Sequence, residues 1–308
     1  MTTVSPSSAP TTSRLPGASV LLALSPTLLS VAWLVSKLRW IWNSQPEMQF
    51  GWIVLMLSAY IVWENWERRP RWVLRPTLLN GAVAVAGLAL LGLVQVYQAA
   101  FGTNAASLCG HTLGTLLVCA SNLHYAFGVP GWRVFGFPLL FLIVAVPMPS
   151  AIQGPVTHGL QNFVARVNVE ILNLSGIPAT LAGSLIHLPN GTVGVDEACS
   201  GIRSLQSSIM ATLFIGYLAL RANVLRVVLF VGGIGIAVLG NLVRSLYLSF
   251  TASSKGIASV SGVHDAAGWS ILLFTAVGVG TLAWYLARLE KISLEDPQST
   301  PVDAPEAS

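Results

Sequence analysis

The chain has 308 residues, of which 54% are hydrophobic and only 9% are charged, and its mean hydropathy is +0.69. Soluble domains carry about 25% charged residues, so this composition excludes an ordinary soluble protein and indicates several membrane crossings. The formal net charge of +4 arises from few charges, so it predicts no nucleic-acid partner; the positions of the basic residues instead report orientation.

The two ends of the chain differ from its apolar middle. Residues 1–16 are rich in Ser, Thr and Pro, and residues 290–308 are acidic and contain Pro. Neither stretch has enough apolar residues to form a packed core, so we expect both to be disordered. Residues 17–289 are then predicted to form one transmembrane domain.

Eight apolar runs are candidates for transmembrane helices, because a span needs roughly 20 apolar residues. The runs cover residues 18–36, 50–64, 77–99, 104–125, 132–148, 199–219, 223–249 and 264–287. The second run is short for a crossing, and no repeat relates the two halves of the chain. The predicted fold class is an all-α polytopic membrane protein with about eight transmembrane helices.

The basic residues between the runs predict the orientation. Placing the N-terminus in the cytoplasm brings most of them to the cytoplasmic side: Arg68, Arg69, Arg71, Arg75, Arg133, Arg221, Arg226, Arg288 and Lys291. Loops rich in Lys and Arg favour that side of the membrane. Both termini are therefore predicted to be cytoplasmic.

The longest stretch outside the apolar runs lies between the fifth and the sixth. Its first part has apolar residues at spacings of three and four: Ile152, Val156, Leu160, Phe163, Val167 and Ile171. Polar residues fill the other face: Gln153, Gln161, Asn162, Arg166, Asn168 and Glu170. This pattern predicts a short amphipathic helix lying in the outer membrane interface.

A β-hairpin is predicted directly after that helix. The β-prone runs 184–188 and 192–195 are separated by Pro189, Asn190 and Gly191. Asn-Gly between such runs is typical of a hairpin turn. The second strand leads into Glu197 and Cys199, so the hairpin is expected to position an extended peptide over the mouth of the helical bundle.

Cys199 is the candidate nucleophile. It lies in the heptapeptide EACSGIR, residues 197–203, where the sixth apolar run begins. Cys109 and Cys119 lie ten residues apart in the fourth run, roughly 15 Å on one helix, which is too far for a disulfide. We expect these two to be packing residues. A helix N-terminus and a nearby cation would lower the pKa of the Cys199 thiol.

Two arginines are candidates for that cation. Arg203 lies four residues after Cys199, so the two would share a face of a helix that begins at Cys199. Its alternatives are a catalytic role or a structural pair with Asp196, Glu197 or Asp265. Arg244 lies near the predicted outer end of the seventh run, where its alternative is a snorkelling interface arginine.

His264 opens the eighth run and is the candidate general acid and base. Asp265 follows it, and either caps the helix or orients the imidazole. The predicted topology brings Cys199, Arg244 and His264 to the outer face at one membrane depth. A Cys–His pair can divide acyl transfer into two steps, while an arginine stabilises the developing oxyanion.

These residues carry a family resemblance. The heptapeptide 197–203, then Asn241-Leu242-Val243-Arg244, then His264 resembles the exosortase/archaeosortase family. Residues 50–52 (FGW), 147–149 (PMP) and the segment 183–191 lie where similar exosortases carry like patterns, so the resemblance covers roughly residues 45–288.

The resemblance implies a membrane cysteine protease or transpeptidase of the bacterial inner membrane, with an outward-facing site. Cys199 would be the nucleophile, Arg244 the essential cation and His264 the general acid/base, with Arg203, Asp265, Glu197 and Asn241 as supporting candidates. The expected partners are exported proteins with a C-terminal sorting signal: a Pro-Glu-Pro-type motif, a transmembrane helix and a basic cluster. The acceptor is left open between water, a lipid and a saccharide, and no metal or organic cofactor is expected.

Other classes remain as alternatives. A transporter would use the intramembrane Arg and His to bind an anion or relay protons, but the paired broken helices of two related halves are not seen. A serine-type intramembrane protease lacks its Gly-x-Ser-x-Gly segment here. A non-catalytic scaffold would leave the outward gathering of the three residues to chance.

Overall fold

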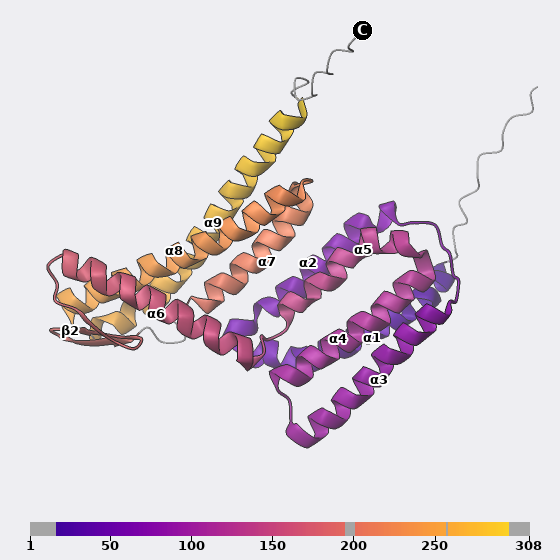
Figure 1. Ribbon diagram of the computed structural model, residues 1–308, viewed down its shortest axis with the longest axis horizontal. Helices are drawn as coiled ribbons and strands as arrows, with labels where there is room; N and C mark the ends of the chain where they lie inside the picture. Colours follow the sequence, from indigo (N-terminus) through magenta and orange to yellow (C-terminus); the bar gives the residue numbers. More distant parts are fainter. Residues whose placement is uncertain (1–16, 195–200, 257, 296–308) are drawn as a thin grey trace, which may run out of the picture. The chain divides into compact units, whose positions relative to one another are not determined.

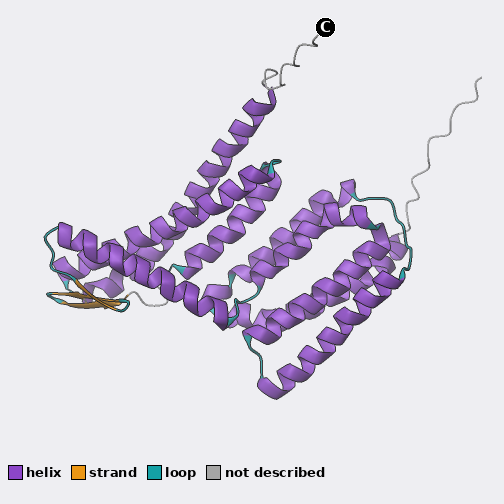
Figure 2. Ribbon diagram, in the orientation of Figure 1, coloured by secondary structure: helices purple, strands orange, loops and turns teal. Residues whose placement is uncertain are grey.

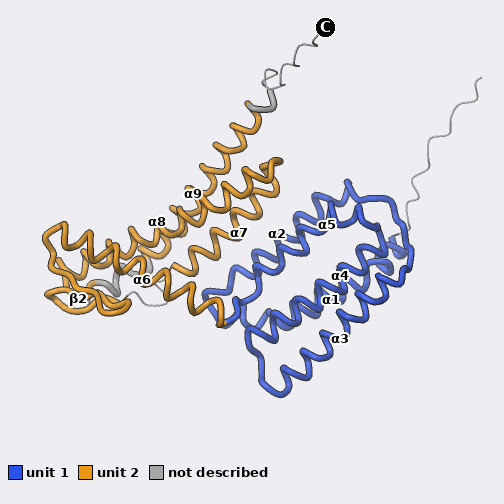
Figure 3. The backbone as a smooth tube through the Cα atoms, viewed as in Figure 1, with its two compact units in different colours: residues 1–149 blue, residues 150–308 orange. Residues whose placement is uncertain are grey.

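The computed structural model describes residues 17–194, 201–256 and 258–295. The described chain is mostly helical, with one small sheet (Figures 1 and 2). It divides into two compact units, residues 1–149 and 150–308 (Figure 3). Each unit has its own packing and is described by itself.

The described residues of unit 1, 17–149, form five α-helices and three short 3₁₀ helices. The α-helices are α1 (Gly17–Ser44), α2 (Phe50–Asn65), α3 (Leu78–Phe101), α4 (Ala105–Phe127) and α5 (Val129–Phe141). The 3₁₀ helices are η1 (Pro46–Met48), η2 (Trp66–Arg68) and η3 (Leu142–Ala145). Helix α4 packs against α1, α3 and α5, so it is the centre of this bundle.

Two short patterns of the sequence meet around one tryptophan of unit 1. A Cβ atom at Gly51 would lie 2.2 Å from the indole nitrogen of Trp42, so only glycine leaves room for that ring. The same nitrogen donates to the carbonyl of Ala145 at 2.9 Å, just before the Pro147–Pro149 stretch. The glycine of the FGW pattern therefore serves packing within unit 1.

Unit 2 contains the remaining helices and the sheet. The helices are α6 (Ser150–Leu174), α7 (Ile202–Ala219), α8 (Asn223–Lys255) and α9 (Ala258–Glu295). The strands β1 (Thr180–Ala182), β2 (Leu185–Leu188) and β3 (Gly191–Gly194) form an antiparallel sheet in the order β1-β2-β3. In its register Leu188 pairs with Gly191, and Leu185 with Gly194.

Helix α8 is the central element of unit 2, since it contacts α6, α7, α9 and β3. Small residues let its neighbours approach closely: a Cβ at Gly233 would lie 2.3 Å from the Thr212 methyl of α7. A Cβ at Gly232 would lie 2.5 Å from Leu282 of α9. Close contact through small residues is how helices associate in lipid, where the hydrophobic effect between them is weak.

The predicted amphipathic helix is present as α6, and its place in the membrane interface stays a prediction. Its buried residues are Thr157, Gln161, Val164, Ala165, Asn168 and Leu172. The stripe that packs in the unit is thus partly polar, while Ile152 and Phe163 of the predicted apolar face are 53% and 52% exposed. In a polar contact with α8, Asn168 donates to Ser245 at 2.5 Å.

Four helices of the described chain are long and apolar enough to cross a membrane: Gly17–Ser44, Leu78–Phe101, Asn223–Lys255 and Ala266–Ile292. A fifth is added if 129–145 and 150–174 count together as one span. The protein is therefore a multi-pass membrane protein, and the count of eight spans stays a prediction.

The last helix extends beyond both of its predicted limits. Helix α9 begins at Ala258, so position 264 lies inside the helix and does not open it. It continues to Glu295, past the predicted start of the acidic tail at 290. The Glu290 carboxylate accepts backbone hydrogen bonds from Arg221 and Ala222, which ties this part of α9 to the α7–α8 connection. The predicted disordered stretches 1–16 and 296–308 lie outside the described residues.

Candidate functional site

The described part of the heptapeptide 197–203 forms a sharp turn at the start of α7. Gly201 is the N-cap of the helix and has φ 78° and ψ 5°, a left-handed conformation that favours glycine. A Cβ at this position would also lie 2.7 Å from Cγ of Asn241. Both the backbone angle and the contact therefore require glycine here.

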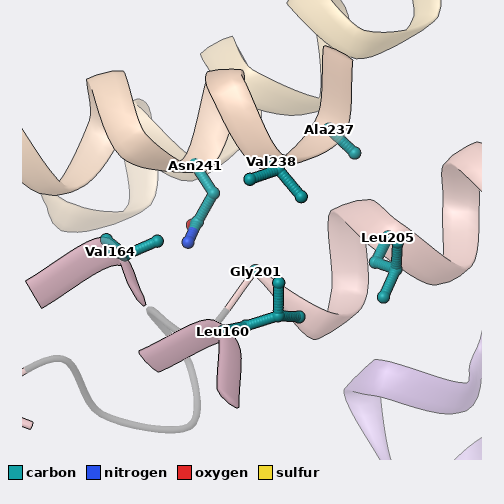
Figure 4. Close-up of a pocket in the computed structure, with 7 residues that line it drawn as sticks. All are labelled: Leu160, Val164, Gly201, Leu205, Ala237, Val238 and Asn241. Carbon is teal, nitrogen blue, oxygen red and sulfur yellow. The ribbon is translucent and has the colours of Figure 1, made fainter. Parts of the chain in front are cut away.

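Three helices of unit 2 converge on this turn (Figure 4). They form a crevice lined by Leu160, Val164, Gly201, Leu205, Ala237, Val238 and Asn241. The crevice leaves no room for a water molecule, and Asn241 is only 3% exposed. The turn after position 199 is thus packed tightly against α8, at a point one helical turn before Arg244.

Arg244 lines a second cavity of unit 2, between α8 and α9. The cavity has a volume of about 330 Å³ and is lined by Val243, Arg244, Tyr247, Ala266, Ala267, Ser270 and Ile271. Its walls are mainly apolar, and Arg244 is the charged residue among the described ones that line it. A guanidinium in apolar surroundings interacts with a partial negative charge more strongly than it would in water.

Gly268 gives the Arg244 side chain its place beside α9. A Cβ at Gly268 would lie 3.6 Å from Nη2 and 3.9 Å from Cζ of Arg244. The guanidinium therefore lies directly against the backbone of α9. Positions 264 and 268 share a face of this helix by its periodicity, which places Arg244 beside the face that carries position 264.

The sheet is fixed to the same end of α8. The Asn190 side chain donates to the carbonyl of Ser253 at 2.7 Å. Ile186 and Leu188 pack in one cluster with Leu248 and Ala252. Strand β3, which leads toward position 199, is thereby held next to the α8 turns that follow Arg244.

The seven predicted site residues divide into three groups. Arg244 and Asn241 lie on α8, at the two cavities described above. Arg203 lies on α7 and is exposed. The predictions for Cys199 and Glu197, and for the side chains of His264 and Asp265, lie outside the described residues.

One geometric prediction needs correction. Arg203 was expected to share a helix face with Cys199, which requires one continuous helix through both positions. Helix α7 begins only at Ile202, after the left-handed Gly201. The positive φ of Gly201 ends the helical path there, so the spacing of four residues no longer implies a shared helix face; Cys199 itself lies outside the described residues.

The sequence analysis missed three residues that shape the site. Gly268 makes room for Arg244, Tyr247 lines the cavity beside it, and Ser245 connects α8 to α6. Gly268 and Tyr247 stand at helical spacing from His264 and Arg244, a signal that was available. Ser245 gave no such signal, because its partner Asn168 was expected on the opposite face of α6.

The cysteines and one histidine of unit 1 are in packed surroundings. Cys119 is fully buried, and Cys109 is half-buried with its thiol 3.7 Å from the Pro147 carbonyl. His111 is fully buried and shares a 2.9 Å hydrogen bond with Gln98. Among the described residues, no three His, Cys, Asp or Glu side chains form a cluster that could hold a metal ion.

Comparison with known families gives one match. The sequence model described as transmembrane exosortase matches residues 42–281, which is most of the chain. No curated protein and no solved structure matches.

Proposed function

We propose a function for this chain from the premise that it belongs to the transmembrane exosortase family. We propose that it is a membrane cysteine peptidase or transpeptidase that processes a C-terminal sorting signal of exported proteins. The family consists in general of cysteine proteases and transpeptidases linked to protein sorting. The family match does not favour the transporter alternative.

The packing of Gly201 on Asn241 is the observation that best supports the proposal. Gly201 lies two residues after Cys199, and Asn241 lies one helical turn before Arg244. The end of the heptapeptide and the Arg244 cavity are therefore neighbours on α8. This is the arrangement that a nucleophile and an oxyanion-stabilising cation require.

The proposed reaction begins with attack on the sorting signal. The Cys199 thiolate attacks the carbonyl carbon of the scissile peptide bond, and the Arg244 guanidinium stabilises the negative charge that develops on the carbonyl oxygen. The C–N bond breaks, the His264 imidazolium protonates the departing amine, and a thioester remains on Cys199.

The second half of the reaction releases the acyl group. The neutral imidazole removes a proton from the hydroxyl or amine of the acceptor, which attacks the thioester carbon. The C–S bond breaks and the thiolate is regenerated. Water as acceptor gives a protease, whereas a lipid or a saccharide gives a transpeptidase.

The surroundings of Arg244 fit a substrate that arrives in the membrane. Helices α8 and α9 are both apolar enough to span a bilayer, and the cavity between them is lined mainly by apolar and small residues. The proposal places this cavity on the outer face of the bacterial inner membrane, with both chain termini in the cytoplasm. The transmembrane helix of the client protein would then dock from the side.

The test replaces Cys199 in cells that produce a tagged protein with a C-terminal sorting signal. Both Cys199→Ala and Cys199→Ser are expected to lose processing by at least about a thousandfold, since the thiolate is the nucleophile. A Cys109→Ala, Cys119→Ala double variant is the matched control and should process normally. Normal processing by both Cys199 variants would overturn the proposal.

A further inference from the structure

The α2–α3 connection of unit 1 carries the strongest cluster of positive charge in the chain. Four arginines lie within eight residues, and α5 adds a fifth near the same end of the bundle: Arg68, Arg69, Arg71, Arg75 and Arg133. Two carboxylates, Glu64 and Glu67, accompany them, so the cluster is net positive. The proposed peptidase reaction uses none of these residues.

The connection is anchored although it contains neither helix nor strand from Arg69 to Thr77 (Figure 2). The ring of Trp72 packs against Phe127 at a tilt of 35° and a centroid distance of 4.5 Å. The Val73 amide donates to the carbonyl of Ala126 at 2.8 Å. These contacts hold the segment against the end of α4.

A backbone turn within the segment and a hydrogen bond near its end give it a defined shape. Leu74 has φ 48°, a left-handed conformation that is uncommon for a residue with a side chain. The carbonyl of Arg75 accepts from the Asn80 side chain at 3.2 Å, which fixes the chain just before α3. The arginines therefore project from a held backbone.

The anchoring turns the arginines outward. Arg68, Arg71, Arg75 and Arg133 are exposed, while Trp72 and Leu74 between them are half-buried. Arg69 is the exception, since it donates to the Trp66 carbonyl at 2.9 Å and lies over the indole ring. The guanidinium groups that remain at the surface form an array beside the apolar helix α3.

The position of this array defines its surroundings. It directly precedes α3, one of the helices that are long and apolar enough to span a membrane. Trp63, which is 71% exposed, lies at the end of α2, as aromatic residues do at a membrane–water boundary. The exposed arginines therefore lie next to the end of a candidate membrane span, which is where lipid headgroups meet a spanning helix.

We propose that the exposed arginines Arg68, Arg71 and Arg75, with Arg133, form a binding surface for the phosphate groups of anionic phospholipids. Arginine presents a planar fork of N–H donors that matches phosphate oxygens. A basic residue close to an anionic membrane surface adds to binding, and several act together. This role goes beyond fixing the orientation, because it persists after the protein is inserted.

An experiment on the purified full-length protein tests phospholipid binding apart from the role of the arginines in fixing orientation, because orientation does not matter in detergent. The protein in a neutral detergent is titrated with short-chain phosphatidylglycerol or short-chain phosphatidylcholine, and the midpoint of thermal unfolding is followed, because a ligand of the folded state raises it. Wild-type protein should bind phosphatidylglycerol more tightly than phosphatidylcholine, and the difference should shrink in salt.

The variants assign this preference to the array. Arg68→Gln, Arg71→Gln and Arg75→Gln together should weaken phosphatidylglycerol binding at least tenfold, whereas the Lys versions should restore most of it. The matched control Arg39→Gln, Arg166→Gln removes two exposed arginines elsewhere and should keep the preference. Equal loss in the control, an unchanged preference in the triple Gln variant, or equal stabilisation by inorganic phosphate would each overturn the proposal.

Discussion

Unit 1 buries reactive side chains in its packing, whereas unit 2 sets a charged side chain at a cavity. In unit 1, Cys119 and His111 are fully buried, and His111 is hydrogen-bonded to Gln98. In unit 2, Arg244 faces a cavity of about 330 Å³, next to the helix face that carries position 264. A reactive residue type is thus a weak guide to function, and the space in front of it is a better one.

After the Cys199 substitutions, the largest effect that separates the two units should come from their histidines. His264→Ala is expected to slow processing of the sorting signal by about a hundredfold or more, since a general acid/base contributes 10²- to 10⁴-fold. The rate is measured in cells with a tagged client protein. His111→Ala is the control: it should process within about twofold of wild type but unfold at lower temperature, because Gln98 loses its partner. A similar loss of processing rate in both variants would contradict the assignment of a catalytic histidine to unit 2 and a packing histidine to unit 1.

Arg244→Lys tests the guanidinium itself and should give the next largest effect. Lysine keeps the charge but loses the planar fork, so we expect about a hundredfold lower processing rate. Arg226→Lys is a control in the same helix, because the Arg226 guanidinium donates to the Leu220 carbonyl at the other end of α8. It should change the rate little. Full activity of Arg244→Lys would reduce the role of Arg244 to charge balance.

Much of this architecture could be predicted from the sequence. The apolar runs predicted helices over the regions of α1 to α5 and α7 to α9, because lipid requires every backbone group to be bonded within its own segment. Gly201 and Asn241 belong to two of the patterns that carried the family resemblance, and they lie against each other in the structure. The membership of the family follows from the same pattern.

Other features could not be predicted, and each has a physical reason. Hydropathy marks the membrane-buried part of a helix, so it missed the polar start of α9 at Ala258. Helical spacing assumes a continuous helix, which the left-handed Gly201 interrupts before α7. The pattern of α6 separated an apolar face from a polar one, but it did not say which residues contact another helix; Asn168 of the polar face contacts α8.

Gly201→Ala tests whether the turn before α7 in unit 2 requires glycine. The alanine would occupy a left-handed conformation and meet Asn241 at 2.7 Å, so we expect a loss of roughly 2–4 kcal/mol of stability and a strong loss of processing. Gly235→Ala in α8 is the matched control, since nothing lies within 4 Å of its Cβ position. Thermal unfolding and processing of this control should match wild type. Wild-type behaviour of Gly201→Ala would show that the turn tolerates a shift.

The smallest effect should come from a pair of equivalent hydrogen bonds, one in each unit. Asn168 donates to Ser245 in unit 2, and Asn122 donates to Thr27 in unit 1, at 2.5 and 2.9 Å. Replacing either asparagine by leucine should cost about 1 kcal/mol of stability, the usual value for such a bond between membrane helices. Only Asn168→Leu should also lower the processing rate, by a few-fold, because Ser245 is the neighbour of Arg244 on α8. Thermal unfolding measures the first effect and client processing the second. Equal processing by the two variants would mean that the contact between α6 and α8 contributes to stability alone. Arg244 would then be held in place by its contact with Gly268 and by the other residues that line its cavity.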